Sequence, residues 1–296
     1  MADAHRGPRY QLAMAAAKAT QAALTAAHRN GGQLPGVIAE KIDPQILADV
    51  PRPQTVVCVS GTNGKTTTNN LLNDLLADNG YEVVNNRAGG NVANGIQSTL
   101  IRNATMSGGT KKDMAVMELD ELSFRKVLPY LTPDVILVTN LYRDSFSRNA
   151  NPDFIFNVMS HYVSPKTKLV LNADDLISCR LAPQDANRVY YSIGRLADDT
   201  AEPQGIVCDL TACPVCGGKL EYDYCHLRHL GHATCKSCGF TNPEPDYELT
   251  ALDREAHTFT VCERSHEGAP THTYRYGNYS ITNLYNLFST VVVARE

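Results

Sequence analysis

The stretch VVCVSGTNGKTTTNNLL, residues 56–72, constrains the fold more than any other part of the chain. A valine-rich run, typical of a buried strand, passes through a turn with two glycines into a helical sequence. Gly61 and Gly64 let the backbone close around an anion, and the start of the helix offers unpaired N–H groups and a positive dipole end. The segment therefore predicts a phosphate-binding strand–turn–helix unit.

Lys65 and Thr66 give this turn its expected chemistry. The lysine would reach the β- and γ-phosphates of a nucleotide, and the threonine hydroxyl would bind Mg²⁺. The general phosphate-loop signature has a glycine five places before Gly64, where this chain has Val59. An ordinary strand-to-helix turn is the alternative, but the coincidence of strand, Gly-Lys-Thr and helix favours phosphate binding.

Apolar, strand-like runs alternate with polar or helical stretches from about residue 55 to residue 195. The runs are TVVCVS, YEVVNN, DMAVME, DVILVTN, TKLVLNA and RVYYSIG. This alternation predicts an α/β fold with a mainly parallel sheet and helices on both faces. Ligands bind at the carboxyl ends of such strands, so Ser60, Glu118, Asn140 and Asn172 are expected to converge there.

The composition limits the class of protein. With 43% hydrophobic and 20% charged residues and a net charge of −4, the chain is typical of a globular protein and gives no general argument for binding nucleic acid or membranes. No apolar run approaches the roughly 18 residues of a membrane span, and no secretory signal is recognisable. The nine cysteines are therefore expected to be free or metal-bound in a reducing compartment.

Residues 4–39 contain no acidic residue but carry Arg6, Arg9, Lys18 and Arg29. Three interpretations follow: a helix packed on the domain with a basic solvated face, a contact with an anionic surface, or an organellar transit peptide. We expect residues 1–54 to form an N-terminal helix and a lead-in to the first strand.

A cysteine-rich insertion interrupts the α/β rhythm after Gly205. Its sequence, CPVCGGKLEYDYCHLRHLGHATCKSCGF, contains two C-x-x-C pairs, formed by Cys213, Cys216, Cys235 and Cys238. This spacing predicts a zinc ribbon, and four thiolates leave no open position for water, so the Zn²⁺ is expected to be structural. Free or disulfide-bonded thiols are the alternative. Four further potential ligands are interpreted as loop residues, namely Cys225, His226, His229 and His232.

With these segments assembled, the chain resembles the Mur ligase family. SGTNGKTTT is similar to the family's ATP loop, and ELDE at 118–121 to its Mg²⁺-binding glutamate segment. TNLYRDSFSR at 139–148 resembles its N-x-x-x-D stretch, and LNADD at 171–175 its nucleotide-side segment. NLYN at 283–286 resembles its N-x-x-N at the adenine end. LPGVIAEKIDPQIL and the four-cysteine insertion are similar to the branch that amidates lipid II.

The resemblance implies a role for particular residues. The implied catalytic residues are Lys65, Glu118 and Asp144. The implied ATP-binding residues are Thr62, Asn63, Gly64, Lys65, Thr66, Thr67, Asn172, Asp175, Asn283 and Asn286. Thr66 and Glu118 would hold Mg²⁺, and Asn91 would face the γ-phosphate or the acceptor. The alternatives are an ordinary turn asparagine for Asn91, a surface or capping carboxylate for Asp144, and an exposed strand-end acid for Glu118.

The resemblance also implies an activity. ATP would convert the α-carboxylate of D-glutamate in the lipid II stem peptide to an acyl phosphate, and ammonia from a GatD-type glutaminase subunit would convert that to D-isoglutamine. The protein would act in the cytoplasm, at the inner face of the bacterial membrane.

The chain also departs from the family pattern. Many family members have histidine where this chain has Ser145, and we cannot place a lysine that would carry a carbamate. About 54 residues precede the first strand, too few for a UDP-binding domain. The family's carboxy-terminal domain is also expected to be missing, which would leave a truncated chain that is inactive alone.

Two other functions compete with this interpretation. Another ATP-dependent amide ligase of the superfamily, such as a folylpolyglutamate synthase, would share the loop but not the zinc insertion. A zinc-ribbon binding module fused to an NTPase-like domain is disfavoured, because the expected ribbon, 205–246, mixes acidic with basic residues. In the Mur ligase interpretation, the central ATP-binding domain would comprise residues 55–204 and 247–296, on either side of the ribbon.

Overall fold

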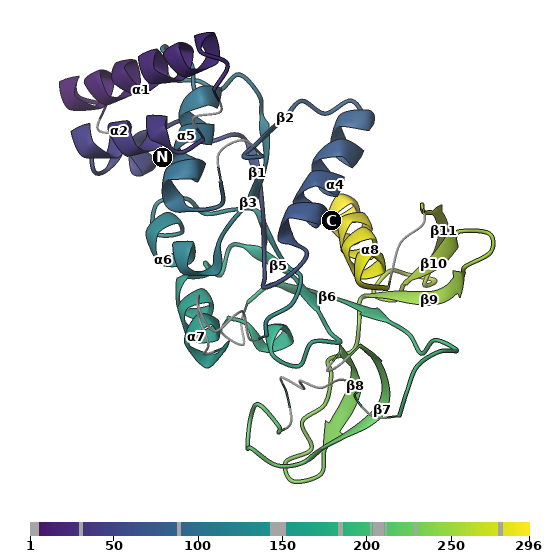
Figure 1. Cartoon of the computed structure of the whole chain (residues 1–296). Helices are drawn as coiled ribbons and strands as arrows, with labels where there is room; N and C mark the ends of the chain where they lie inside the picture. Colours follow the sequence, from purple (N-terminus) through teal and green to yellow (C-terminus); the bar gives the residue numbers. More distant parts are fainter. Residues whose placement is uncertain are drawn as a thin grey trace.

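A nine-stranded sheet forms the centre of the protein (Figure 1). The computed structural model describes residues 6–29, 32–87, 90–142, 152–182, 186–201, 203, 210, 212–227, 230–277 and 281–296. The strands of this sheet, in sequence order, are β1 (Thr55–Ser60), β2 (Val83–Asn85), β3 (Met114–Glu118), β4 (Val135–Val138), β5 (Lys168–Asn172), β6 (Arg188–Ile193), β9 (Tyr247–Asp253), β10 (Thr258–Glu263) and β11 (Thr271–Arg275).

The spatial order of the strands is β11-β10-β9-β6-β5-β4-β1-β3-β2. All neighbouring pairs from β2 to β9 are parallel, and β10 and β11 continue the sheet in antiparallel fashion. The prediction of an α/β fold with a mainly parallel sheet is therefore confirmed. β9 lies beyond the cysteine-rich insertion in sequence, yet it pairs directly with β6.

Helices cover both faces of the sheet (Figure 1). One face carries α4 (Lys65–Asp78) and α8 (Ile281–Arg295), and the other carries α5 (Ala93–Asn103), α6 (Phe124–Val127) and α7 (Pro152–Tyr162). Two 3₁₀ turns, η1 (Glu121–Ser123) and η2 (Ser178–Arg180), follow β3 and β5. Among the described residues, no helix combines the length and apolar character that a membrane span requires.

β1 shows how the sequence encodes these two faces. Val56 and Cys58 point into the core beneath α5 to α7, whereas Val57 and Val59 point into the core beneath α4 and α8. Because successive side chains of a strand alternate between faces, a strand that is buried on both sides reads as a continuous apolar run.

The acid-poor N-terminal segment forms α1 (Pro8–Ala26), followed by α2 (Leu34–Ile42) and α3 (Ile46–Asp49). α1 buries Tyr10, Ala13, Met14 and Ala17 against the domain, so the prediction of a packed helix is confirmed. Its basic residues do not merely face solvent: Lys18 Nζ donates to the carbonyl of Ile101 at 2.9 Å. The other two interpretations of this segment stay untested.

The insertion contains a hairpin of β7 (Leu220–Leu227) and β8 (Leu230–Cys235). The interpretation of Cys225, His226 and His232 as loop residues is wrong, because all three lie in these strands. Cys225 and the ring of His226 are both buried although the two residues are consecutive, and the register between β7 and β8 shifts between Cys225 and Leu227. His229 lies outside the described residues.

Candidate functional site

The turn between β1 and α4 needs its two glycines. Gly61 has φ 123° and Gly64 has φ 85°, a backbone region that favours glycine. A Cβ atom on Gly61 would overlap Thr139 Oγ1, and one on Gly64 would overlap the side chain of Asn286 from α8. The turn is thus enclosed by the end of β4 on one side and by the last helix on the other.

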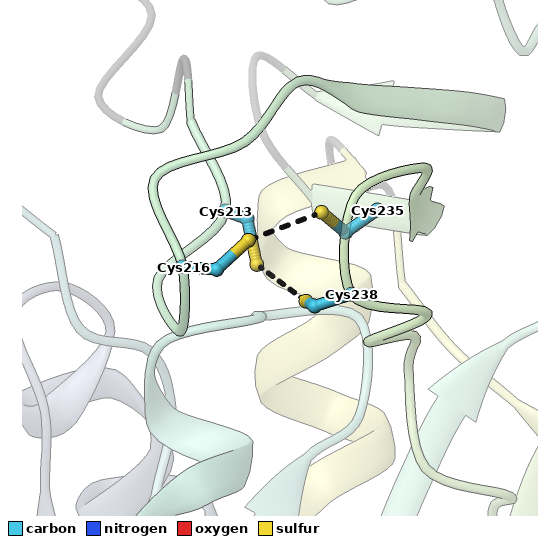
Figure 2. A group of neighbouring side chains, drawn as sticks. All are labelled: Cys213, Cys216, Cys235 and Cys238. Carbon is cyan, nitrogen blue, oxygen red and sulfur yellow. Dashed lines mark hydrogen bonds between the residues drawn. The ribbon is translucent and has the colours of Figure 1, made fainter.

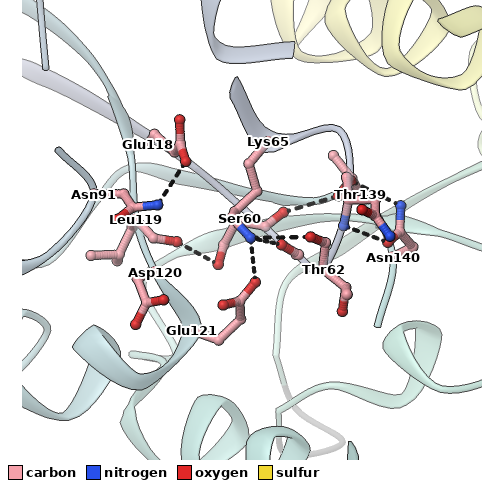
Figure 3. Close-up of polar contacts among 12 residues, drawn as sticks. Ser60, Thr62, Lys65, Asn91, Glu118, Leu119, Asp120, Glu121, Thr139 and Asn140 are labelled. Atoms are coloured by element: carbon pink, nitrogen blue, oxygen red, sulfur yellow. Dashed lines mark hydrogen bonds and ion pairs between the residues drawn. The ribbon is translucent and has the colours of Figure 1, made fainter. Parts of the chain in front are cut away.

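The residues after β4 hold this turn in place (Figure 3). Asn63 N donates to Asn140 Oδ1 at 3.0 Å, and Thr62 N donates to the carbonyl of Asn140 at 2.8 Å. Thr139 Oγ1 donates to the carbonyl of Asn63 at 2.7 Å. The expected convergence of strand ends is confirmed, and contacts within the chain hold the loop in this shape.

Lys65, the first residue of α4, is folded back on the loop (Figure 3). Its ammonium donates to the carbonyl of Gly61 and, at 2.8 Å, to Glu121 Oε1 in η1. Both side chains of this ion pair are largely buried, and burial raises the pKa of Glu121 while Lys65 opposes that rise. The sequence analysis missed Glu121 as the partner of Lys65; its only signal was the second glutamate of ELDE.

Glu118, at the end of β3, faces the start of α4. Thr66 Oγ1 donates to Glu118 Oε2 at 2.7 Å, and Asn91 Nδ2 donates to Glu118 Oε1 at 2.8 Å. Asn86 fixes the backbone of Glu118 from both sides, accepting from its N–H at 2.9 Å and donating to its carbonyl at 2.8 Å. The sequence analysis missed Asn86, for which the asparagine pair at the end of β2 was the only signal.

Thr66, Asn91 and Glu118 share one cavity of about 320 Å³. Its lining consists of Thr66, Asn69, Asn70, Asn86, Arg87, Gly90, Asn91 and Glu118. Carboxylate and hydroxyl oxygens are the ligands that Mg²⁺ prefers, so Thr66 and Glu118 fit the expected ion in donor chemistry. The amide and guanidinium donors in the same wall could bind an anionic group beside it.

Asn172 and Asp175 lie behind the loop that follows β4. Asn172 Nδ2 donates to the carbonyl of Thr139 at 3.3 Å, and Asp175 Oδ2 accepts from Leu141 N at 2.6 Å. Both side chains are fully buried. In the structure, these two side chains therefore support the backbone of residues 139–141. Their expected contact with the nucleotide stays a prediction.

Three of the remaining predicted residues lie around the start of α4. Asn286 stands beside Gly64, and its Nδ2 donates to Asn283 Oδ1 at 3.5 Å. Thr67 is exposed on the first turn of α4. Asp144 lies outside the described residues, so its expected role stays a prediction.

The four predicted zinc ligands come together (Figure 2). The Sγ atoms of Cys213, Cys216, Cys235 and Cys238 lie within 4.8 Å of one another. The Cys213–Cys238 and Cys216–Cys235 sulfur pairs are 3.7 and 3.6 Å apart. Zn–S bonds of about 2.3 Å in a tetrahedron place sulfurs about 3.8 Å apart. The cluster fits a four-thiolate zinc ion in both spacing and donor type.

The β7–β8 hairpin, which ends at Cys235, is anchored to the sheet. Asn242, just after β8, donates from Nδ2 to the carbonyl of Ala173 at 2.6 Å. Gly231 N donates to the carbonyl of Asp174 at 3.1 Å. His226 contacts Asp199 Oδ1 through Nδ1 and the carbonyl of Ile193 through Nε2, at 2.7 and 2.8 Å. The insertion therefore rests on the carboxyl ends of β5 and β6.

Known proteins share both the sequence and the fold. Residues 59–215, just over half of the chain, match the model of the Mur ligase middle domain. The chain is 37% identical over 239 residues to the lipid II isoglutaminyl synthase (glutamine-hydrolyzing) subunit MurT of Staphylococcus aureus (strain COL), which covers 80% of this chain and 53% of that protein. The corresponding subunit of Streptococcus pneumoniae is 29% identical over 267 residues, or 90% and 58% of the two chains.

Among solved structures, a pseudomurein peptide ligase type C from Methanothermus fervidus superposes with a TM-score of 0.65 and 27% sequence identity. The match covers 85% of this chain and 48% of that one. The chain thus spans about half the length of the curated relatives that it matches.

Proposed function

Because the chain belongs to the Mur ligase family, we propose that it is the ATP-dependent ligase component that amidates lipid II. The proposed reaction converts the α-carboxylate of D-glutamate in the stem peptide to D-isoglutamine, with ammonia from a GatD-type glutaminase subunit. One observation carries the proposal: Lys65, Thr66, Glu118 and Asn91 converge on the turn and the adjoining cavity of a Mur-type fold. The similarity to MurT subunits supports the choice of lipid II as acceptor.

The nucleotide would bind at the turn between β1 and α4. The free N–H groups at the start of α4 and the ammonium of Lys65 would take the β- and γ-phosphates, with Lys65 exchanging its loop carbonyls and Glu121 for phosphate oxygens. Thr66 and Glu118 would hold Mg²⁺. A bound Mg²⁺ supplies charge neutralisation during phosphoryl transfer.

The chemistry proceeds in two steps. A carboxylate oxygen of the acceptor attacks the γ-phosphorus, the bond to the β–γ bridging oxygen breaks, and ADP leaves. The nitrogen of ammonia then attacks the acyl carbon, the carbon–oxygen bond to phosphate breaks, and a proton is lost from nitrogen. Asn91 lies beside Glu118, where its amide can orient the acceptor for in-line attack.

The four cysteines would bind a structural zinc ion. This ion would hold the segments before β7 and after β8 together and so stabilise the insertion that rests on β5 and β6. The proposed boundaries of this zinc ribbon are residues 205 and 246.

An amidation assay tests the function. The full-length protein, with the glutaminase, glutamine, MgATP and lipid II, should lower the mass of the stem peptide by the replacement of a hydroxyl with an amino group. A mass increase that corresponds to an added amino acid, or no change, would contradict the proposal and favour another amide ligase.

Lys65→Ala tests the nucleotide site. Loss of a charge-assisted contact to phosphate should weaken MgATP binding about tenfold or more, measured by calorimetry. Lys126→Ala is the matched control, because Lys126 is exposed on α6. Equal affinities for the two variants would contradict the assignment of Lys65, and binding that is insensitive to EDTA would contradict that of Glu118.

A further inference from the structure

A second cavity, of about 350 Å³, lies at the free edge of β2, the last strand of the sheet. Its lining consists of Val83, Val84, Asn85, Arg102, Asn103, Lys111 and Lys112. Three of these side chains are cationic and none is acidic. We call this the β2-edge cavity. A hollow lined by one sign of charge concentrates counter-ions, so its electrostatics favour an anion.

The cations of the β2-edge cavity are not neutralised within the described part of the chain. Arg102 Nη2 donates to the carbonyl of Asn85 at 2.6 Å, and Lys112 Nζ donates to the carbonyl of Val83 at 3.0 Å. These are single bonds to neutral acceptors, and no ion pair between described residues involves Arg102, Lys111 or Lys112. Each of the three retains donors for a ligand.

A fourth cation stands close by. Lys18 of α1 donates to the carbonyls of Ile101 and Ala104 at the end of α5. Burial lowers the pKa of Lys18, and the charge of Lys111 lowers it further. The free carbonyls and the negative dipole at the C-terminal end of α5 explain the position of the Lys18 ammonium. They do not explain the position of Lys111, whose charge repels that of Lys18, and a bound anion would relieve this repulsion.

Protection of a free sheet edge is the simplest alternative, since lysines on edge strands discourage pairing with another chain. It explains why Arg102 and Lys112 cover the outward carbonyls of β2. It leaves the hollow and Lys111 unexplained.

We propose that the β2-edge cavity binds a phosphate or diphosphate group through Arg102, Lys111 and Lys112. A guanidinium fork together with two ammonium groups matches a multiply charged anion with several oxygens better than a single carboxylate. The site is separate from the nucleotide loop and goes beyond the proposed function.

The β2-edge cavity and the cavity at Glu118 have no lining residue in common, although consecutive residues line them. Asn85 lines the first cavity, whereas Asn86 and Arg87, the next residues along the chain, line the second.

Calorimetry with inorganic pyrophosphate tests the site, with saturating MgADP present to fill the nucleotide loop. Lys111→Gln combined with Lys112→Gln should weaken pyrophosphate binding about tenfold or more. Lys126→Gln combined with Lys166→Gln removes the same charge from exposed positions elsewhere and should retain the parent affinity. Lys111→Gln alone should weaken binding severalfold without affecting the fold, because its side chain forms no hydrogen bond in the described structure.

Two arms distinguish the source of the phosphate. If the Lys111 and Lys112 substitutions also abolish co-sedimentation with phosphatidylglycerol vesicles, and no variant binds phosphatidylcholine vesicles, the site takes a lipid headgroup. Loss of pyrophosphate binding with unchanged vesicle binding assigns it to a free or substrate-borne diphosphate. Absence of pyrophosphate binding by the parent, or equal losses in the two double variants, would overturn the proposal.

Discussion

Lys65 is the residue on which nucleotide binding is expected to depend, and its ammonium has partners within the chain. Its ammonium contacts the carbonyls of Gly61 and Thr62 and the carboxylate of Glu121. A phosphate must therefore replace Glu121 as the partner of Lys65 rather than meet a free cation. We infer that Glu121 moderates the affinity of the loop for ATP.

The pH dependence of binding tests this competition. Burial raises the pKa of Glu121 above its usual value of 4.5, so its carboxyl gains a proton at a higher pH than an exposed glutamate does. As pH falls through this raised pKa, Glu121 becomes neutral and Lys65 is released. Above this pKa, Glu121→Gln should therefore bind MgATP more tightly than the parent does. As the pH falls through it, the affinity of the parent should rise toward that of the variant.

Calorimetric titration of both proteins across the acidic and neutral range measures this difference, and the ionisation of ATP itself cancels in the comparison. Glu255→Gln, an exposed change of the same charge, serves as control and should follow the parent. A constant affinity ratio between parent and Glu121→Gln at every pH would contradict the moderating role.

At the scale of elements, β7 and β8 form a separate two-stranded sheet, and such a hairpin is marginally stable without further support. Its cysteine cluster and its contacts with β5 and β6 are separate sources of stability. Substitutions can remove the cysteine cluster or the contacts with β5 and β6 separately.

The cluster is tested by metal analysis. The parent should contain one zinc ion, and Cys235→Ser combined with Cys238→Ser should lose it, because two thiolates no longer close a tetrahedral site. The melting temperature should fall clearly, while MgATP affinity should change little. Cys262→Ser, on β10, should keep the metal. A full complement of zinc in the double variant would contradict the ligand set.

The docking contact is tested with Asn242→Ala. Asn242 is buried, donates to the carbonyls of Ala173 and Gly231, and accepts from Ala233 N. Its removal leaves buried backbone groups unpaired and should lower the free energy of unfolding by about 1–3 kcal/mol. Denaturant titration measures the change. Asn79→Ala, at the exposed end of α4, should cost much less, and equal costs would contradict the docking role.

At the scale of the whole molecule, residues distant in sequence complete one face of the sheet. α8 packs beside α4 and contributes to the same core, although the β7–β8 hairpin and strands β9, β10 and β11 separate α8 from β6 in sequence (Figure 1). Phe288 of α8 is fully buried and packs edge-on against Tyr191 of β6. The turn between β1 and α4 thus packs against α8, with Asn286 beside Gly64.

Phe288→Ala should lower the free energy of unfolding by about 3–5 kcal/mol, because it removes a fully buried aromatic ring and leaves a cavity. Phe154→Ala, which removes a ring that is 48% exposed on α7, should cost substantially less. Thermal or denaturant unfolding measures both. Similar losses would show that α8 is not integral to the core.

Local patterns determined the main elements and part of the site. The alternation of apolar runs predicted the parallel strands, and the glycine spacing predicted the turn before α4, since periodicity and backbone freedom are properties of a few adjacent residues. The position of Glu118 at a strand end predicted that it would face this turn, because parallel strands end at one edge. The doubled C-x-x-C spacing likewise predicted that four sulfurs would meet.

Only the tertiary structure decided which side chains pair across segments. The contacts of Lys65 with Glu121, and of Asn86 with Glu118, join separate turns whose distance is set by strand register and helix packing. His226 shows the same limit: we interpreted it as a loop residue because the two C-x-x-C pairs already complete four-coordination, but it lies in β7, which pairs with β8, and its ring contacts Asp199. Sequence spacing encodes the faces of elements, whereas contacts between faces arise when the whole chain packs.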